Sequence, residues 1–331
     1  HPRGRGGEGA RGREEGRGRG DRRVPEHRGQ EPVQGRGEAR GEAGDEARGE
    51  AGDEAGTQAG TGWREALLLT RAPVLVGADT GGTFTDLVAV VGGRLRVLKL
   101  RSTPEDPAAA VLEGLAILAG EAGAVRLHYG STVATNALLE RRGARVVLLT
   151  TAGFEDVLAI GRQVRPVLYA LEPALPPPLV PRARRLGVRE RVLADGRVET
   201  PLGRAEVARV MAAVRRSRAE AVVVCLLHGY VRPDHERRLG RALSGRGLHV
   251  TLAHRLLREY REYERLSTCV VNAYVGPVMT RHVRALAAAV PGGLRVMQSS
   301  GGLIGAPAAC AEAVRTVLSG PAAGVIGAAD R

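Results

Sequence analysis

The stretch VLVGADTGGTFTDLVAVV, residues 74–91, constrains the fold more than any other part of the chain. An apolar run ends at Asp79, a segment rich in glycine and threonine follows, and the chain then becomes apolar again. A third apolar run, RLRVLKL, follows Gly92-Gly93. Short apolar runs bounded by glycine turns predict β-strands. We therefore expect a glycine-rich loop that joins one strand directly to the next.

This expected hairpin differs from the P-loop and the dinucleotide-binding turn, which both lead from a strand into a helix. A hairpin still suits a phosphate, because glycine lets backbone N–H groups approach an anion closely. Gly81 and Gly82 would give such groups, and three hydroxyl groups would add to them: those of Thr80, Thr83 and Thr85. Asp79, at the strand end, would hold the hydration shell of Mg²⁺. A plain glycine hairpin with Asp79 capping the turn fits the same residues.

Small hydroxyl-bearing residues also gather near other predicted strand ends. Four polar side chains follow the strand near residue 128, at the expected start of a helix: Ser131, Thr132, Thr135 and Asn136. Ordinary helix capping explains Ser131 or Thr132 alone. The segment QSSGG follows another strand, and Ser319-Gly320-Pro321 opens an Ala/Gly-rich helix. Because free N–H groups at helix starts favour anions, the repeated pattern predicts one shared polyphosphate site.

Strand and helix patterns alternate through residues 127–163, with one helix expected from Phe154, and this alternation predicts an α/β fold. Asp195-Gly196 indicates a β-hairpin. A helix is expected at about 203–218, before a buried strand, and residues 258–286 have the pattern of another helix.

His228, His235 and Glu236 lie close enough in the sequence to raise the question of a metal site. Asp234 is placed to cap a helix, so we interpret this group as one cap and two loop histidines. The three cysteines lie far apart and fit neither a disulfide framework nor a zinc site: Cys225, Cys269 and Cys310.

The first 62 residues differ in composition from the rest of the chain. They consist mainly of Gly, Arg, Glu and Ala, and such a segment buries too little apolar surface to offset the entropy of folding. We expect a disordered, low-complexity tail at 1–62. Its 12 Arg against 13 Asp and Glu give a charge of −1, and since the whole chain carries +13, residues 63–331 carry +14.

The basic charge raises the question of a nucleic-acid partner. Lys99 is the only lysine and aromatic residues are 3%, which leaves few platforms for base stacking. We therefore interpret the arginine excess as compositional bias. No apolar run approaches the roughly 20 residues that span a bilayer, so we expect no membrane span. The three scattered cysteines, which fit no disulfide framework, favour a reducing cytoplasm as the location.

Seven segments carry a resemblance to a known family: GADTGGTFTD, GSTVATNALLERRGAR, TTAGFEDVLAIGRQ, CLLHGY, REYERLSTCVVNAYV, QSSGG and RTVLSGPAAGV. In the order and sequence of these segments, residues 73–331 resemble the hydantoinase A/oxoprolinase family. This family includes ATP-dependent N-methylhydantoinases, oxoprolinases and nucleotide-binding subunits of acetone carboxylases. The resemblance implies an actin-like ATPase (ribonuclease H-like) lobe whose first phosphate loop is the hairpin. It also implies an N-terminal domain at 73–250 and the start of a main domain at 251–331.

The resemblance implies a role for each site residue. Asp79 would belong to the Mg²⁺–phosphate site, and Asp86 would order the loop or assist phosphoryl transfer. Arg162 would contact the substrate or a phosphate. The remaining implied nucleotide contacts are Thr80, Gly81, Gly82, Thr83, Thr85, Ser131, Thr132, Asn136, Ser319 and Gly320.

The implied reaction uses ATP and Mg²⁺ to open a cyclic amide of the hydantoin or oxoproline type. Phosphorylation of the carbonyl oxygen would turn that oxygen into a leaving group, and water would then open the ring. The implied partner is a hydantoinase B-type subunit or domain.

The sequence departs from the family pattern at three places. Tyr129 stands where the family more usually has a histidine, and Arg255 stands where a carboxylate is commoner. Relatives continue with a second DxGGTSTD loop, so we expect a truncated second lobe and a chain that is inactive alone. A sugar-kinase-like phosphotransferase would share the first loop without explaining REYERLSTCVVNAYV. A non-enzymatic, basic polyanion-binding protein is the other alternative.

Overall fold

A computed structural model describes residues 73–103, 105–120, 124–164, 166–172 and 176–329. All of these residues belong to one unit of the chain, Gln58–Arg331. The tail expected at 1–62 therefore lies outside the described residues. Among the helices that the structure describes, none is long and apolar enough to cross a membrane. The cytoplasmic location stays a prediction.

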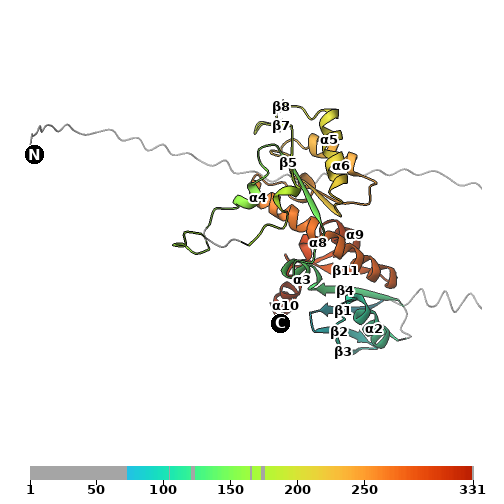
Figure 1. The fold of residues 1–331 in the computed structure, drawn as a ribbon. Helices are drawn as coiled ribbons and strands as arrows, with labels where there is room; N and C mark the ends of the chain where they lie inside the picture. The colour runs from blue at the N-terminus through green and yellow to red at the C-terminus, as the bar shows by residue number, and fades with distance from the viewer. Residues whose placement is uncertain (1–72, 104, 121–123, 165, 173–175, 330–331) are drawn as a thin grey trace, which may run out of the picture. The chain divides into compact units, whose positions relative to one another are not determined.

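The first sheet has six strands in the order β12-β11-β4-β1-β2-β3 (Figure 1). Its strands are β1 (Val74–Thr80), β2 (Phe84–Val91), β3 (Arg94–Arg101), β4 (Val125–Ser131), β11 (Leu294–Met297) and β12 (Leu303–Gly305). Strands β1, β2 and β3 pair antiparallel, whereas β4 lies parallel to both β1 and β11. The three strands predicted around the glycine loop are therefore confirmed, and a hairpin joins the first two.

One face of this sheet is covered by helix α2 (Pro107–Ala119), which contacts β1, β2 and β3. Alternate residues of β1 and β2 point to that face, so Val76 and Leu87 are buried. The Asp106 carboxyl accepts the Ala108 N–H at 3.2 Å and begins the helix. Gly114 allows a close approach, because a Cβ atom there would lie 2.5 Å from a Leu87 methyl carbon.

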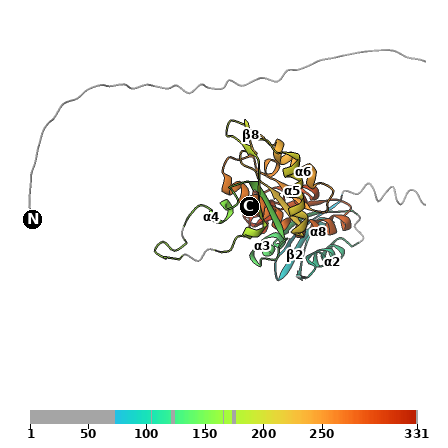
Figure 2. The ribbon, with the colours of Figure 1, turned by 45° about the horizontal axis from the view of Figure 1, so that its top comes forward.

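The second sheet has four parallel strands in the order β10-β9-β5-β6. They are β5 (Val146–Thr151), β6 (Arg185–Val188), β9 (Ala221–Val224) and β10 (His249–Leu252). The central strands β5 and β9 are fully buried, as their continuous apolar sequences predict. Helices α5 (Arg204–Arg216) and α6 (Asp234–Leu243) contact each other beside this sheet, away from α2 (Figures 1 and 2).

Helix α8 (Glu262–Ala289) connects the two sheets, since it contacts α2 and α3 (Val133–Leu139) as well as β5, β9 and β10. One hydrophobic core extends along it from the first sheet into the second. The helix predicted at 258–286 is therefore present, with its start at Glu262. The mixed α/β fold predicted from the alternation is also confirmed.

Other elements complete the described chain. They are α4 (Val157–Ile160), η1 (Arg182–Arg184), β7 (Arg191–Val192), β8 (Val198–Thr200), α7 (Ala253–Leu256), α9 (Ala306–Ala311), η2 (Ala313–Thr316) and α10 (Ser319–Ala329). Strands β7 and β8 confirm the hairpin predicted at Asp195-Gly196, where Gly196 has a φ of 84°. The boundary expected between residues 250 and 251 stays a prediction.

Two local predictions were wrong in detail. The helix expected from Phe154 is only the four-residue α4, because Gly161 adopts a φ of 59° that turns the chain away. Asp234 does not cap α6 with its side chain, since the helix begins at Asp234 itself and Pro233 occupies the capping position.

Candidate functional site

The tip of the β1–β2 hairpin is a closed turn braced by the end of β3. The Gly81 N–H donates to the Phe84 carbonyl at 2.9 Å. Ser102 holds the tip from the side of β3, because its N–H donates to the Thr83 carbonyl and its hydroxyl donates to the Gly81 carbonyl, both at 2.9 Å. Gly82 is exposed at the tip. The hairpin therefore has a fixed backbone and an accessible end.

Asp79 lies where three elements meet. On β1 it pairs with Asp86 of β2 and with Gly130 of β4. A Cβ atom on Gly130 would lie 2.9 Å from Asp79 Oδ1, and one on Gly320, in the first turn of α10, would lie 3.4 Å from the same oxygen. The carboxyl group therefore occupies a slot between two glycines.

The surroundings of Asp79 favour a cation. Asp79 is exposed as a whole residue, but partial burial of its carboxyl group raises its pKa, and the nearby charge of Asp86 raises it further. In the described residues, no group of three or more His, Cys, Asp or Glu side chains is arranged to hold a metal ion. Mg²⁺ usually keeps several waters and takes one or two carboxylates, so a single Asp79 carboxylate beside a phosphate fits this ion.

Asp86 forms an ion pair across the sheet. Its carboxylate lies 2.6 Å from Lys99 Nζ, and Lys99 in turn lies 4.9 Å from the centre of the Phe84 ring. These contacts tie β2 to β3 beside the hairpin tip, and both roles implied for Asp86 stay predictions.

The start of α3 is tied to the hairpin. The Thr132 N–H and hydroxyl both donate to the Thr80 carbonyl, at 3.0 and 3.1 Å. The Asn136 amide donates to the Thr132 hydroxyl at 3.3 Å, and its nitrogen lies 4.0 Å from the position of a Cβ atom on Gly82. The Ser131 hydroxyl accepts the Val133 N–H at 3.1 Å. These polar side chains therefore lie beside the hairpin tip.

The start of α10 joins the same cluster. The buried Ser319 hydroxyl donates to the Ser131 carbonyl at 3.2 Å, and the Leu318 N–H donates to the Thr135 hydroxyl at 2.9 Å. Three of the four predicted segments are therefore adjacent: the hairpin, the start of α3 and the start of α10. In the fourth, QSSGG, the Ser299 N–H and hydroxyl donate to the Arg315 carbonyl at 2.7 and 2.9 Å. A shared polyphosphate site stays a prediction.

Two predicted hydroxyl donors face inward. Thr80 is 2% exposed and Thr85 is 0% exposed. Thr85 Oγ1 lies 3.0 Å from Ser102 Oγ and 3.5 Å from Thr80 Oγ1. These two threonines therefore brace the hairpin from within the protein, while Asp79, Gly82 and Thr83 are its exposed groups.

Arg162 lies apart from this cluster. Its Nε donates to Glu264 at 2.7 Å, at the start of α8, and its guanidinium lies 5.9 Å from the centre of the Tyr263 ring. Both contacts belong to a surface beside α4. The structure therefore places Arg162 with α8, and its contact with substrate stays a prediction.

Sequence reasoning missed Ser102 and Gly130 as parts of the site. Ser102 directly follows β3, and the expected meander β1-β2-β3 could have placed it beside the hairpin tip. Gly130, on β4, directly precedes Ser131 of the predicted site, so its place next to that loop was the sequence signal that could have identified it.

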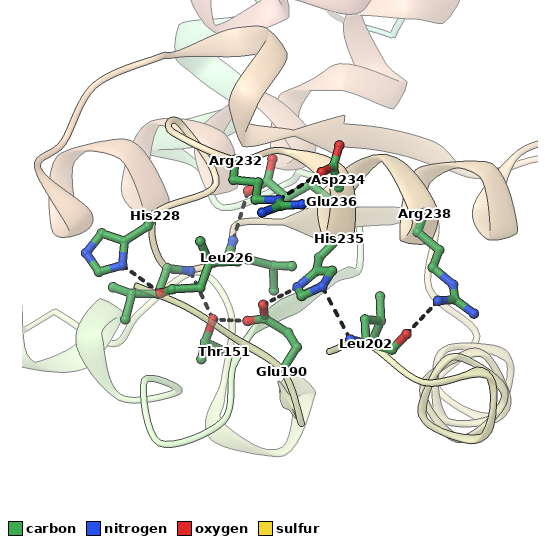
Figure 3. Close-up of polar contacts among 12 residues, drawn as sticks. Thr151, Glu190, Leu202, Leu226, His228, Arg232, Asp234, His235, Glu236 and Arg238 are labelled. Carbon is green, nitrogen blue, oxygen red and sulfur yellow. Dashed lines mark hydrogen bonds and ion pairs between the residues drawn. The ribbon is translucent and has the colours of Figure 1, made fainter. Parts of the chain in front are cut away.

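His228 lies in the loop after β9 of the second sheet, whereas His235 and Glu236 lie in the first turn of α6, so the expectation of two loop histidines was wrong for His235. The three side chains make different hydrogen bonds (Figure 3). His228 Nδ1 lies 2.8 Å from the Val192 carbonyl, and His235 Nδ1 lies 2.7 Å from Glu190 Oε2. The buried Glu236 carboxylate accepts the Leu226 N–H at 2.9 Å. The Thr151 hydroxyl also donates to Glu190. The three side chains therefore connect the loops at the end of this sheet.

A separate groove of about 1070 Å³ lies between α6, β10, α8 and α9. Its arginines include Arg241, Arg255 and Arg284, among mostly aliphatic walls. The hairpin, Asp79 and the start of α3 do not line it. A large volume does not by itself identify a functional site. The polar groups that converge around Asp79 are therefore a better candidate site than this groove.

Comparisons with known proteins point to one family. Residues 75–247 match the hydantoinase/oxoprolinase N-terminal region, and residues 265–331 match hydantoinase/oxoprolinase. Caprolactamase subunit alpha of Pseudomonas jessenii is 34% identical over 268 residues, and 5-oxoprolinase 1 of Arabidopsis thaliana is 32% identical over 291 residues. Each match covers 75% of this chain, but the chain spans only 38% and 23% of those relatives.

A solved structure shares the fold. The nucleotide-free structure of acetone carboxylase, from a study of ATP-dependent acetone carboxylation, superimposes with a TM-score of 0.68 at 29% identity. The similarity covers 77% of this chain and 40% of that chain.

Proposed function

Because the chain belongs to the hydantoinase/oxoprolinase family, we propose that it supplies a phosphate-binding lobe of an ATP-dependent enzyme that opens a cyclic amide. The lobe would be of the actin-like ATPase type. The convergence of the hairpin, the start of α3 and the start of α10 around Asp79 carries the proposal. The names of two relatives, a caprolactamase subunit and a 5-oxoprolinase, support a cyclic amide as substrate.

The exposed groups of the site suit MgATP. Backbone N–H groups at Gly82 and Thr83 would donate to phosphate oxygens, as glycine-rich hairpins allow. Asp79 would bind the waters of Mg²⁺, which would neutralise phosphate charge when bound. Burial and Asp86 disfavour the ionised form of Asp79 in the free protein, so a divalent cation would relieve that cost.

The reaction that we propose begins with the amide carbonyl, which is a poor electrophile in an unstrained ring. The carbonyl oxygen attacks the γ-phosphorus of ATP, and ADP leaves. Water adds to the ring carbon, the C–N bond breaks, and the nitrogen takes a proton. A second water attacks the carbonyl carbon of the resulting acyl phosphate, and the C–O bond to the phosphoryl group breaks, which gives a carboxylate and inorganic phosphate that carries the original carbonyl oxygen. Fixed backbone N–H groups stabilise the charge on the transferred phosphoryl oxygens.

Phosphates in an actin-like ATPase lie between two hairpin loops on opposing lobes, and the hairpin at Gly81-Gly82 is one such loop. We therefore infer that this chain alone turns over no ATP at a useful rate, and that a hydantoinase B-type subunit or domain assists the whole enzyme. The designation of one relative as a subunit alpha supports a multi-subunit assembly.

Isotope transfer tests the chemistry directly. The chain, together with the polypeptide that completes the enzyme, would be given ATP and 5-oxoproline, hydantoin or caprolactam labelled with ¹⁸O at the ring carbonyl. Phosphorylation of that oxygen predicts ¹⁸O in the inorganic phosphate. Ring opening with all of the label in the product carboxylate would refute the mechanism, and ATP turnover by the chain alone would refute the dependence on a second loop.

A further inference from the structure

A buried polar pair lies beneath the phosphate hairpin. Tyr129, on β4, is 0% exposed, and its hydroxyl oxygen lies 2.8 Å from Nε2 of His282, on α8. The two rings are tilted by 45° with their centres 5.4 Å apart. His282 is itself 8% exposed, so this contact lies in the core between the first sheet and α8.

Both partners are uncharged at neutral pH. Burial raises the pKa of the Tyr129 phenol to about 12 and lowers the pKa of the His282 imidazole to about 4. The pair is therefore a neutral hydrogen bond whose strength does not depend on a charge. Either partner left alone would have an unsatisfied polar atom in the core, which is costly.

Hydroxyl groups continue from this pair to the hairpin on one face of the first sheet. Tyr129 pairs with Ala78 and Ser131 pairs with Thr80 across β4 and β1, so the side chains of Tyr129, Ser131 and Thr80 share that face. Burial raises the pKa of Tyr129, and the Ser131 and Thr80 hydroxyls act against that rise. Thr80 Oγ1 lies 3.5 Å from Thr85 Oγ1, which lies 3.0 Å from Ser102 Oγ. The chain of contacts ends where the Ser102 hydroxyl donates to the Gly81 carbonyl at 2.9 Å. Buried hydroxyl networks of this kind act as a unit, because each bond orients the next.

The final contact determines the direction of one N–H group at the hairpin tip. The carbonyl of Gly81 and the N–H of Gly82 belong to the same planar peptide unit, so they point in opposite directions. A Gly81 carbonyl that points inward to Ser102 therefore directs the Gly82 N–H outward. Without that bond, glycine at both positions would let the peptide unit rotate freely.

We propose that Tyr129 and His282 are positioning residues for the phosphate hairpin, acting through Thr80, Thr85 and Ser102 to orient the Gly82 N–H toward a bound phosphate. This inference rests on the proposed function of the hairpin. Neither residue touches the nucleotide. The role extends the site to α8, a helix that joins its sheet to the second sheet.

The test combines three variants with a matched control. Tyr129→Phe removes the hydroxyl, and His282→Leu removes the hydrogen-bonding ring. His282→Gln keeps an amide that can donate or accept. Tyr274→Phe is the control, because Tyr274 is another nearly buried tyrosine, on α8 against Gly143. Global stability of each variant would be measured by urea unfolding, so that local effects are separated from unfolding.

The main measurement is amide hydrogen exchange, by NMR, of the Gly81 and Ser102 N–H groups, which both donate to hairpin carbonyls. We expect Tyr129→Phe and His282→Leu to speed this exchange about tenfold, the effect of losing one buried hydrogen bond. His282→Gln and Tyr274→Phe should leave it near the wild-type rate. MgATP affinity should fall in the first two variants only.

Unchanged exchange at Gly81 and Ser102 in folded Tyr129→Phe and His282→Leu proteins would overturn the inference. Equal acceleration in His282→Gln would overturn it as well, since a merely structural loss of the ring would then explain the effect. The exchange measurement needs no nucleotide. A wild-type chain that never binds MgATP would therefore count against the proposed function, separately from the positioning role.

Discussion

Replacing Gly130 with alanine should weaken MgATP binding without weakening the fold. The new Cβ atom would lie 2.9 Å from Asp79 Oδ1, and ordinary van der Waals contact begins at 3.4 Å. The Asp79 carboxyl group would therefore have to move by about 0.5 Å, the tolerance within which functional groups must be held. The closest atom belongs to a side chain, so the backbone of the sheet need not shift.

The two expected effects of Gly130→Ala have opposite signs. Gly130 does not adopt a positive φ, so alanine fits the strand. By reducing the conformational entropy of the unfolded chain, alanine should contribute about 0.4–1 kcal/mol to the free energy of unfolding. The free energy of unfolding should therefore stay the same or rise slightly. Displacement of a group that positions a metal costs about tenfold to hundredfold in affinity. We expect the Kd for MgATP to rise by that factor.

Isothermal titration with MgATP and urea unfolding measure the two effects on the same preparations. Gly203→Ala is the matched control, because a Cβ atom at Gly203 meets no other atom within 4 Å. Equal MgATP affinity in Gly130→Ala and wild type would refute the reasoning that the slot beside Asp79 matters for binding. A loss of affinity together with a large loss of stability would show that the fold, rather than the carboxyl position, had changed.

Three further predictions concern other groups. Asp79→Asn should raise the thermal midpoint of the Mg²⁺-free protein at neutral pH, because the pKa of Asp79 is raised in the folded state and ionisation of its carboxyl group therefore costs folding free energy. The same variant should lose Mg²⁺-dependent nucleotide binding. In the wild type, nucleotide binding should weaken on acidification at a higher pH than the pKa of an ordinary aspartate would give. Glu236→Ala should lower the free energy of unfolding by about 3 kcal/mol in urea titrations, since the N–H groups of Leu226 and His254 lose a buried acceptor, and unchanged stability would contradict this. Arg162→Gln should change the Kd for MgATP by less than about twofold, because its ion pair with Glu264 is exposed and lies beside α4; a large rise would show that Arg162 reaches the phosphates.

The hairpin could be predicted from sequence because its determinants are local. Two apolar runs with alternate buried positions surround two glycines, and few backbone conformations satisfy such a pattern. The same applies to Asp195-Gly196. The helix expected from Phe154 was overestimated, because Gly161 adopts a φ of 59° that ends it after the four residues of α4.

Contacts between distant residues could not be predicted in the same way. Tyr129 and His282 are separated by 153 positions, and only the packing of α8 on the first sheet brings them together. The pair Asp86–Lys99 depends on the register of β2 and β3, and a pattern of alternation does not distinguish registers that differ by two residues. Thr85 was expected to face a phosphate, but the register turns its hydroxyl toward Ser102.

We propose that the hairpin and the starts of α3 and α10 form one site for the phosphates of MgATP. This can be measured by titrating the ¹⁵N-labelled chain with MgATP and following amide shifts by NMR. We expect shifts concentrated at residues 80–83, 131–136 and 318–320, and no such shifts in the Asp79→Asn variant. Shifts concentrated instead around Arg241, Arg255 and Arg284 in the separate groove, or equal shifts in Asp79→Asn, would contradict it.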